Sequence, residues 1–336
     1  MEYLTFLLLW CNVYITIHGM EDTTAITLSL KEQFSELIQK FIDAQDVSPS
    51  SRQTYRRSLV QFFKWFSRKK NPHPTRETIL AYKEALDVQG LRPFTRASYL
   101  VAVRKFFEWL ESNKLYPNVA KGIKGAKRSL KSHQKDSLTI ENIKKLIKAI
   151  DRQTLQGKRD FALVNLLIRT GLRLIEISRA DIGDLQENPD GDALLWVRGK
   201  GRDGKDDFVV LTQETLDPLH EYLQARRPKS KREPLFASLS DRNNGQRITT
   251  FSFSRLIKRY LRKAGMDSKR LTAHSLRHTF GVLSITAGAS LYEVQLAMRH
   301  TAPTTTELYL GDIERTKRLK DAPERKIGML LQDIED

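Results

Sequence analysis

Two related segments in the first third of the chain most constrain its fold. The motif Ser-Arg-Gln-Thr-Tyr at residues 51–55 recurs as Thr-Arg-Ala-Ser-Tyr at 95–99, and Phe-Phe-Lys-Trp at 62–65 recurs at the same offset as Phe-Phe-Glu-Trp at 106–109. Each copy begins with a hydroxyl residue that can cap a helix and ends in an aromatic cluster. Residues 28–112 carry amphipathic stripes and no clear period of two, so we predict an all-helical unit with its Phe and Trp side chains in one small core.

The rest of the chain is long enough for a second domain. Its 336 residues are 40% hydrophobic, which excludes a mainly disordered chain. After Leu138 the patterns predict a hairpin of strands 193–197 and 208–211, and helices at 139–150, 159–170, 213–225, 251–264, 275–287, 291–298 and 304–309. We therefore expect a mainly α protein, with a helical domain at 28–116, a basic linker at 117–136 and a mostly helical, mixed α/β domain with a small sheet at 137–320.

The charge of the chain points to a polyanionic partner. Lys and Arg number 57 against 40 Asp and Glu, a net charge of +17, and nucleic acid or an anionic membrane surface is the usual partner of such a surplus. A solvated charged face is the alternative for any single arginine, and a flexible solvated segment is the alternative for the linker. The candidates for phosphate contact are Arg52, Arg56 and Arg96 in the helical domain and Lys124, Lys127 and Arg128 in the linker.

An apolar run at residues 4–17 has the length of the hydrophobic part of a signal peptide. It is shorter than the roughly 20 residues of a transmembrane helix. It also lacks a positive leading segment, because Glu2 follows Met1, and no small-x-small cleavage site comes after it. Met20 opens a polar stretch typical of a normal start. We interpret residues 1–27 as an extension from an over-extended or alternative start, with a signal or membrane-proximal element as the alternative.

Four groups of polar residues in the second domain form a set suited to phosphoryl transfer. They are Thr-Gly-Leu-Arg-Leu-Ile-Glu at 170–176, Gly-Lys-Gly at 199–201, His-Ser-Leu-Arg-His at 274–278, and His300 followed nine positions later by Tyr309. Two arginines can clamp the oxygens of a phosphodiester, and a phenol can attack phosphorus to form a covalent phosphotyrosine. A histidine can manage protons, and a lysine on a hairpin can protonate the leaving oxygen.

These groups resemble the motifs of the tyrosine recombinases, the family that includes phage lambda integrase, Cre and the bacterial Xer proteins. The resemblance covers residues 28–312 and implies that Tyr309 is the nucleophile and that Lys200 is the general acid toward the 5′ oxygen, with Lys205 a lesser candidate. It implies a supporting role for Glu176, and we interpret His278 as a supporting or packing residue. The full catalytic set implied is Arg173, Lys200, His274, Arg277, His300 and Tyr309.

The resemblance also implies an architecture and an assembly. We expect a two-domain clamp around duplex DNA, with a SAM-like helical core-binding domain and a catalytic domain. We expect a dimer on each site, a homotetramer on paired sites, and strand exchange through a Holliday junction, with DNA-bending proteins as accessory partners. The two-domain layout favours a Xer-like or mobile-element enzyme, and the expected location is the cytoplasm with no membrane partner.

Two positions depart from the family pattern. The family commonly has Leu-Gly before the third histidine, whereas this chain has Met298 and Arg299, an arginine that could contact DNA or a neighbouring protomer. The hairpin also continues through Asp203, Asp206 and Asp207, which makes it more acidic than the usual basic continuation.

Other functions remain open at the level of the residues. His274 and His278 have the i, i+4 spacing of a zinc pair, but no Glu follows His274 and no acidic cluster completes a site. Cys11 is the single cysteine, which excludes an intramolecular disulfide and a Cys-rich zinc site. The chain shows no P-loop or dinucleotide motif, so we predict no cofactor. A non-catalytic DNA-binding protein of the same fold and a type IB topoisomerase-like enzyme are the alternatives.

The C-terminal tail, residues 321–336, has the opposite charge to the rest of the chain. It carries five acids against two bases, so a DNA contact is not expected. Its apolar residues have near-helical spacing and predict an amphipathic helix that needs an apolar groove. By resemblance we expect this helix to dock on a neighbouring protomer, and folding back on its own domain is the alternative.

Overall fold

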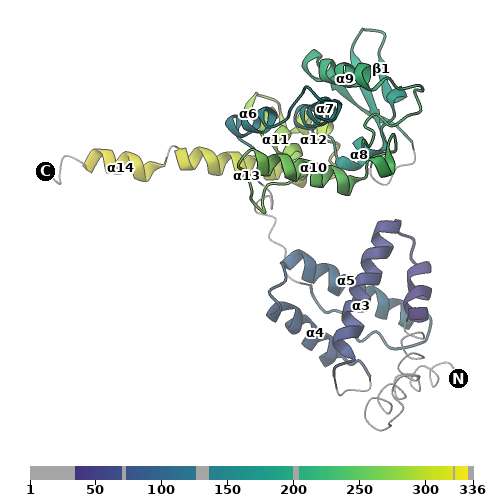
Figure 1. The fold of residues 1–336 in the computed structure, drawn as a ribbon. Coiled ribbons are helices and arrows are strands. Elements are labelled where there is room, and N and C mark those ends of the chain that lie inside the picture. Colours follow the sequence, from purple (N-terminus) through teal and green to yellow (C-terminus); the bar gives the residue numbers. More distant parts are fainter. Residues whose placement is uncertain (1–34, 70–72, 126–135, 200–203, 321, 332–336) are drawn as a thin grey trace. The chain divides into compact units, whose positions relative to one another are not determined.

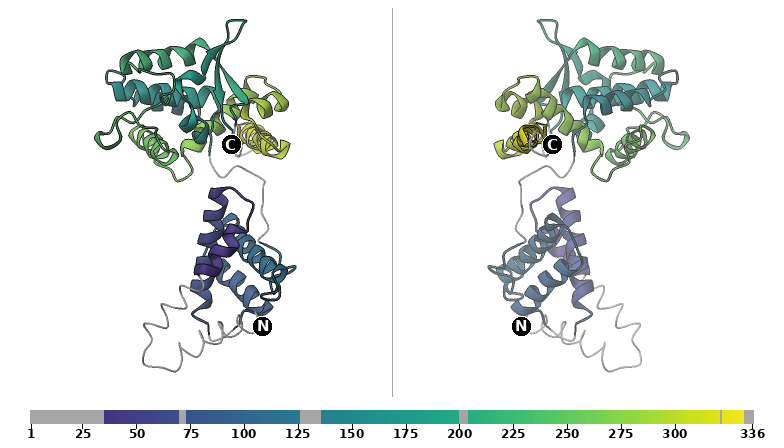
Figure 2. Two further views of the ribbon diagram at one scale, coloured as in Figure 1. Left: turned by 90° about the vertical axis from the view of Figure 1, so that its right-hand side faces the viewer. Right: turned by 90° about the vertical axis from the view of Figure 1, so that its left-hand side faces the viewer.

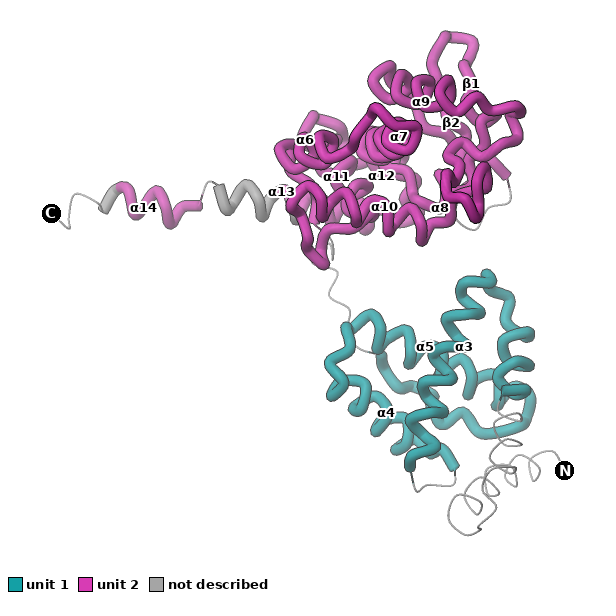
Figure 3. Tube along the Cα trace, viewed as in Figure 1, with its two compact units in different colours: residues 1–129 teal, residues 130–336 magenta. Residues whose placement is uncertain are grey.

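The computed structural model describes residues 35–69, 73–125, 136–199, 204–320 and 322–331. The apolar run at 4–17, most of the second half of the predicted linker and the hairpin tip with Lys200 lie outside these residues. The chain divides into two compact units, residues 1–129 and 130–336 (Figure 3). No helix of the described ranges is long and apolar enough to cross a membrane.

The first unit is helical, as predicted. Residues 35–43 form a helix and are followed by α3 (Pro49–Phe66), α4 (Arg76–Val88) and α5 (Pro93–Ser112) (Figure 1). The aromatic clusters of the two related segments pack crosswise: the ring of Phe62 lies 6.2 Å from that of Phe107, and Phe63 lies 5.6 Å from Phe106. Tyr82 of α4 adds an edge contact to Phe62 at 5.0 Å. The repeated sequence therefore produces one shared aromatic core.

The prediction that a hydroxyl residue of each repeat caps its helix was wrong. Helix α3 is capped by Ser48, whose side chain accepts from the backbone N–H of Ser51, and α5 begins after Arg92 with no side-chain cap. Ser51 and Thr95 lie inside the first turns. Each helix starts earlier because a proline occupies its first turn, where the missing N–H has no intrahelical partner in any case.

The first part of the predicted linker packs onto the first unit. Ala120 and Ile123 are buried in its core, and the Tyr116 hydroxyl donates to the carbonyl of Pro74 at 2.8 Å. Arg76 donates to the carbonyl of Lys121 at 2.6 Å. Residues 117–125 thus belong to the structured part of this unit because they bury apolar side chains and pair their backbone.

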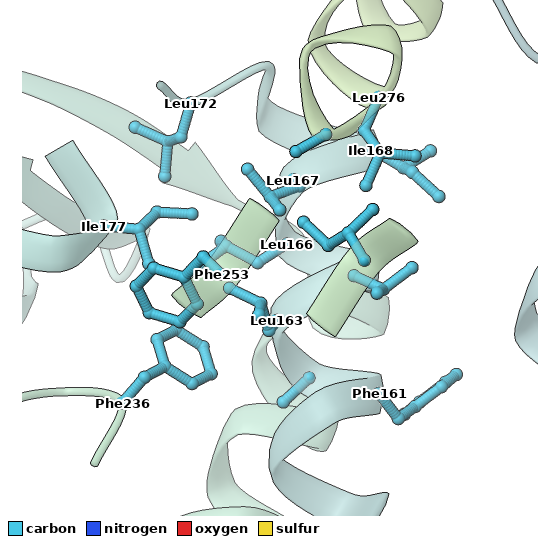
Figure 4. Packing of buried hydrophobic residues seen from close by; sticks show 14 of the residues in the cluster. Phe161, Leu163, Leu166, Leu167, Ile168, Leu172, Ile177, Phe236, Phe253 and Leu276 are labelled. Atoms are coloured by element: carbon cyan, nitrogen blue, oxygen red, sulfur yellow. The ribbon is translucent and has the colours of Figure 1, made fainter. Parts of the chain in front are cut away.

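The second unit is built around a central helix, α7 (Leu155–Thr170), which is buried on nearly all sides and carries a mostly apolar run at residues 161–168. Leu163, Leu166 and Leu167 of α7 pack with Phe236, Phe253 and Leu276 from later parts of the chain (Figure 4). The other helices of this unit are α6 (Ile140–Lys148), α8 (Leu174–Arg179), α9 (Gln213–Arg226), α10 (Thr250–Lys263), α11 (Ala273–Thr286), α12 (Leu291–Met298), α13 (Pro303–Lys320) and α14 (Pro323–Leu331).

A small antiparallel sheet completes the second unit, in the order β1 (Leu185–Glu187), β2 (Ala193–Val197), β3 (Asp207–Leu211). Figure 2 shows this unit from two further sides. The predicted hairpin is confirmed, with Trp196 opposite Phe208 in the register. Strand β1 and helix α8 were not predicted, because segments of three and six residues are too short to show a period. Helix α13 continues well beyond the predicted end at Tyr309.

Candidate active site

The second unit brings most of the predicted catalytic residues together from separate elements. Arg173 stands at the start of α8, Arg277 and His278 lie in α11, His300 follows α12, and Tyr309 lies in α13. His274 lies exposed in the first turn of α11. Lys200 falls outside the described residues.

Arg173 is held by Glu176, one helical turn later. The buried Glu176 carboxylate accepts from the Arg173 backbone N–H at 2.7 Å and from its Nη1 at 2.9 Å. Burial alone would raise the pKa of Glu176, but the charge of Arg299 and the donors on Arg173 and Arg299 outweigh it, so this pKa lies below its ordinary value. A carboxylate that stays ionised fixes the direction of the Arg173 guanidinium.

Arg277 is the most deeply buried cation of the site, with 3% of its surface exposed. It donates to the carbonyl oxygens of Gly171 and Met298, and so joins the end of α7 to the end of α12. Burial, together with the positive charge of Arg173, lowers the pKa of Arg277 to about 9. One carboxylate, Glu176, faces this cationic group, which leaves the site short of negative charge and suited to an anion.

Tyr309 lies among the histidines, with 3% of its surface exposed. Its ring centroid is 5.0 Å from that of His278 and 6.2 Å from that of His300, and the His300 ring is nearly parallel to it at 8°. The Nδ1 of His300 shares a hydrogen bond with the Thr306 hydroxyl at 2.9 Å, which orients the imidazole. Gly281 of α11 faces the Tyr309 ring so closely that a Cβ atom on Gly281 would clash with the ring unless one of them moved.

Lys205, the lesser candidate for the general acid, is bound by two aspartates. Its Nζ lies 2.6 Å from Asp184 and 3.0 Å from Asp181. Partial burial lowers the pKa of Lys205, but these hydrogen bonds and charges outweigh burial and raise it overall. A raised pKa makes proton donation harder, so the geometry assigns Lys205 to anchoring the hairpin. On the β2 side of the hairpin, Arg179 donates to the carbonyl oxygen of Gly199 at 3.3 Å.

The arginines predicted to contact phosphate in the first unit have protein partners. Arg52 donates to the carbonyl of Gln45 at 3.1 Å, Arg56 donates to the Gln39 side chain, and Arg96 pairs with Asp87. Lys124 is exposed, while Lys127 and Arg128 fall outside the described residues. Guanidinium groups can keep a protein partner and still offer N–H donors, so these contacts leave the phosphate assignment a prediction.

Sequence reasoning missed one basic surface, on α10. Its apolar residues Phe253, Ile257 and Leu261 face the core, and its cations line a groove of about 1050 Å³ together with Ser252 and Ser254. The sequence pattern of residues 251–264 predicts a helix, and its amphipathic character also places every cation of α10 on the face opposite the core. That distribution of cations is the signal from which the basic surface could have been predicted. The cations of this groove are Arg255, Lys258, Arg259 and Arg262 of α10 and the buried Arg159 of α7.

The expected contact of Arg299 with DNA or a neighbouring protomer stays a prediction, because the contacts of its side chain in this structure are within the chain. The Arg299 side chain is 7% exposed and donates to Glu176 at 2.9 Å. Within the described ranges no three His, Cys, Asp or Glu side chains are grouped as metal ligands.

Comparison with known families matches both units. A sequence model of the Phage integrase family matches residues 136–314, and a model of the phage integrase N-terminal SAM-like domain matches residues 34–114. The tyrosine recombinase XerA of Pyrococcus furiosus is 34% identical over 189 residues, 56% of this chain and 61% of that protein. XerC of Chlamydia trachomatis is 33% identical over 201 residues, 59% of this chain and 60% of that protein. The chain thus aligns with about three fifths of the length of each.

A relative with a longer alignment and two solved structures extend the likeness. A tyrosine recombinase of Synechococcus elongatus is 27% identical over 277 residues, 78% of this chain and 84% of that protein. The fold resembles that of the XerH site-specific recombinase bound to a palindromic difH substrate, with a TM-score of 0.69 and 23% identity over 95% of this chain and 96% of that one. It also resembles a lambda integrase tetramer bound to a Holliday junction, with a TM-score of 0.62 and 15% identity over 82% and 76% of the two chains.

Proposed function

The chain belongs to the Phage integrase family, and from this premise we propose that it is a site-specific tyrosine recombinase that cuts and rejoins duplex DNA. The observation that carries the proposal is the position of Tyr309. Its ring lies 5.0 Å from that of His278 and 6.2 Å from that of His300, in the unit in which Arg173, Arg277 and Arg299 surround one carboxylate, Glu176. A nucleophile, proton carriers and anion-binding groups from four separate elements therefore share one site.

The proposed reaction exchanges one phosphate ester for another. The Tyr309 oxygen attacks phosphorus, the bond from phosphorus to the 5′ oxygen breaks, and a 3′-phosphotyrosine forms with a free 5′ hydroxyl. Arg173 and Arg277 hold the non-bridging oxygens and stabilise the charge of the pentacoordinate transition state. In the second half the 5′ hydroxyl of a partner strand attacks the phosphotyrosine and releases Tyr309. Each ester bond is replaced by another, so no nucleotide or metal is needed to conserve the bond energy.

Proton transfer falls to the histidines and a lysine. We assign the protons of the two half-reactions to His300, whose ring is oriented by Thr306, and to His274 at the exposed start of α11. Lys200 protonates the departing 5′ oxygen from the tip of the β2–β3 hairpin. The ion pairs of Lys205 with Asp181 and Asp184 support this choice, since they commit Lys205 to anchoring.

The DNA is held by both units. The catalytic unit contributes the basic groove of α10, and the first unit contributes the outer arginines around Arg52, Arg56 and Arg96, with Lys124, Lys127 and Arg128 along the linker. Phosphate contacts of this kind fix the register of the protein on the duplex. We further propose a dimer on each site and a tetramer on paired sites, with DNA-bending proteins as accessory partners and the cytoplasm as the location.

The tail is the proposed assembly element. Helix α14 is amphipathic and its side chains at residues 323–329 are exposed, Ile327 by 54% and Met329 by 71%. An exposed apolar stripe of this kind requires a groove on another surface. Docking on a neighbouring protomer would link the position of Tyr309, on the preceding helix α13, to assembly.

The test is covalent capture. Duplexes with random cores, each carrying a nick, are incubated with the protein, and the DNA that stays attached under denaturing conditions is sequenced. We expect one recurring site and a phosphopeptide that maps to Tyr309. Binding of a recurring site without any adduct would identify a non-catalytic DNA-binding protein. Relaxation of supercoiled plasmids that lack the site would identify a topoisomerase instead.

A further inference from the structure

Arg299 occupies a backbone conformation that favours glycine. It ends α12 with φ 55° and ψ 48°, in the left-handed region that few side chains adopt because Cβ approaches the neighbouring carbonyl. Its side chain is nevertheless buried, at 7% exposure. A buried arginine in a strained conformation persists only when its contacts offset the cost.

The contacts of Arg299 close a ring with the first catalytic arginine. Its carbonyl oxygen accepts from Arg173 Nη2 at 3.0 Å, and its own Nη2 donates to Glu176 Oε2 at 2.9 Å. Glu176 completes the ring through Oε1, which accepts from Arg173 Nη1 at 2.9 Å. Arg173 is thus held from two sides, by the backbone of Arg299 and by a carboxylate that Arg299 also holds.

The ring also changes the distribution of charge. Glu176 is fully buried and its carboxylate is shared between the guanidinium groups of Arg173 and Arg299. If Glu176 contacted Arg173 and not Arg299, its negative charge would largely neutralise the positive charge of Arg173. Because Arg299 supplies a second positive charge to the same carboxylate, Arg173 and Arg277 keep a surplus for an incoming phosphate. A glycine at position 299 would relieve the backbone strain and still provide the carbonyl oxygen for Arg173, but it would not provide the second positive charge beside Glu176.

We propose that Arg299 is a positioning residue of the recombination reaction: it fixes Glu176, and through Glu176 it sets the orientation and the effective charge of Arg173. The inference rests on the proposed function and deepens it. It assigns to this chain a third arginine that acts on the cleavage step without touching the scissile phosphate.

The test compares Arg299→Gly and Arg299→Lys with a matched control. Arg227 ends α9 with the same left-handed backbone, φ 55°, and has an exposed side chain, so Arg227→Gly relieves the same strain outside the site. We expect Arg299→Gly to slow single-turnover formation of the covalent adduct by about 10- to 100-fold, the equivalent of one lost charge-assisted hydrogen bond. Half-site binding should change by less than about threefold, since affinity comes from many phosphate contacts.

The remaining variants separate positioning from folding. Arg299→Lys keeps a positive charge near Glu176 and should recover part of the cleavage rate, and Arg227→Gly should cleave as the wild type does. If Arg299→Gly cleaves at the wild-type rate while the wild type forms the adduct, the inference is overturned and the proposed function stands. If the wild type forms no adduct, the proposed function fails first.

A crystal structure of Arg299→Gly decides the inference without a DNA substrate. We expect the Glu176 carboxylate, released from Arg299, to turn and pair more fully with the Arg173 guanidinium, which changes the position of both side chains. An Arg173 side chain that keeps the same contacts in the variant would overturn the inference, whatever the cleavage assay shows.

Discussion

Gly281 lies directly against the ring of Tyr309. A methyl group on the Gly281 Cα would come within 2.7 Å of the Tyr309 Cζ and 2.8 Å of its Cε1, closer than any real contact of this kind. Gly281 is inside α11, where glycine is unfavourable for helix formation by about 1 kcal/mol relative to alanine. The helix therefore carries a destabilising residue at a position that faces the candidate nucleophile.

Gly281→Ala should move the nucleophile. The added methyl group must displace the Tyr309 ring or the helix that carries it, and a misplacement of about 1 Å can cost about 100-fold in rate. We expect slow adduct formation with unchanged half-site binding. Thr286→Ala is the control, because it favours the same helix at an exposed position away from Tyr309. Wild-type cleavage by Gly281→Ala would show that the contact relaxes without consequence.

Tyr309→Phe should abolish strand cleavage. Only the attacking oxygen is removed, and the ring that packs against His278 and His300 remains. Binding to the site should stay within about threefold of the wild type, as measured by gel shift on the same duplex. If the variant still forms an adduct, the nucleophile has to be reassigned, and the exposed Tyr292 would be tested next.

Inorganic phosphate should stabilise the protein through Arg277. An anion that binds the folded site raises the unfolding temperature of the second unit, residues 130–336, by about 2–4 °C for each kcal/mol of binding free energy. Burial lowers the pKa of Arg277, but a guanidinium in a protein keeps its charge at neutral pH, so the contact with phosphate should be present at about pH 7.5.

Thermal unfolding in phosphate and in chloride at equal ionic strength measures this effect. Arg277→Met should lose the phosphate-dependent rise, whereas Arg152→Met, at a distant exposed arginine paired with Glu221, should keep it. An equal rise in all three proteins would mean that phosphate acts on the general surface charge.

Lys200 and Lys205 should respond differently to a sulfur substrate. Replacing the bridging 5′ oxygen by sulfur creates a leaving group that needs no acid, so Lys200→Ala should recover much of its lost cleavage rate on this substrate. Lys205→Ala removes the ion pairs with Asp181 and Asp184, and its defect should persist because the hairpin has lost an anchor. If the sulfur substrate restored cleavage by Lys205→Ala and not by Lys200→Ala, Lys205 would be the general acid and Lys200 would not.

Deleting residues 322–336 should separate binding from assembly. The truncated protein should bind one half-site as tightly as the full chain, because the removed segment is acidic and carries no phosphate contact. It should lose cooperative pairing on the full site in a gel-shift titration. Replacing the exposed Ile327 and Met329 by serine should have the same effect, and unchanged cooperativity would favour a helix that folds on its own domain.

The sequence predicted those features that depend on local patterns. The aromatic spacing at 62–65 and 106–109 predicted a helical core, and the predicted helices and hairpin are present with shifts at their ends, the largest in α13, which runs on to Lys320. The shifts have local causes that the pattern did not weigh: Pro49 and Pro93 start their helices early, and Thr154 caps α7 ahead of its predicted start. Elements of three to six residues, β1 and α8, were missed because their period cannot be counted.

By itself the sequence determined which chemical groups this protein has and the order in which they occur, because residue type and spacing are local properties. Only the tertiary structure decided what those groups touch. It placed Arg299 on Glu176, Lys205 on Asp184 and the Tyr309 ring on Gly281. Most of these contacts join segments that are far apart in the chain and meet only when the helices pack around α7. Burial and neighbouring charge, which set the pKa and the orientation of a side chain, arise from that packing and have no local signature.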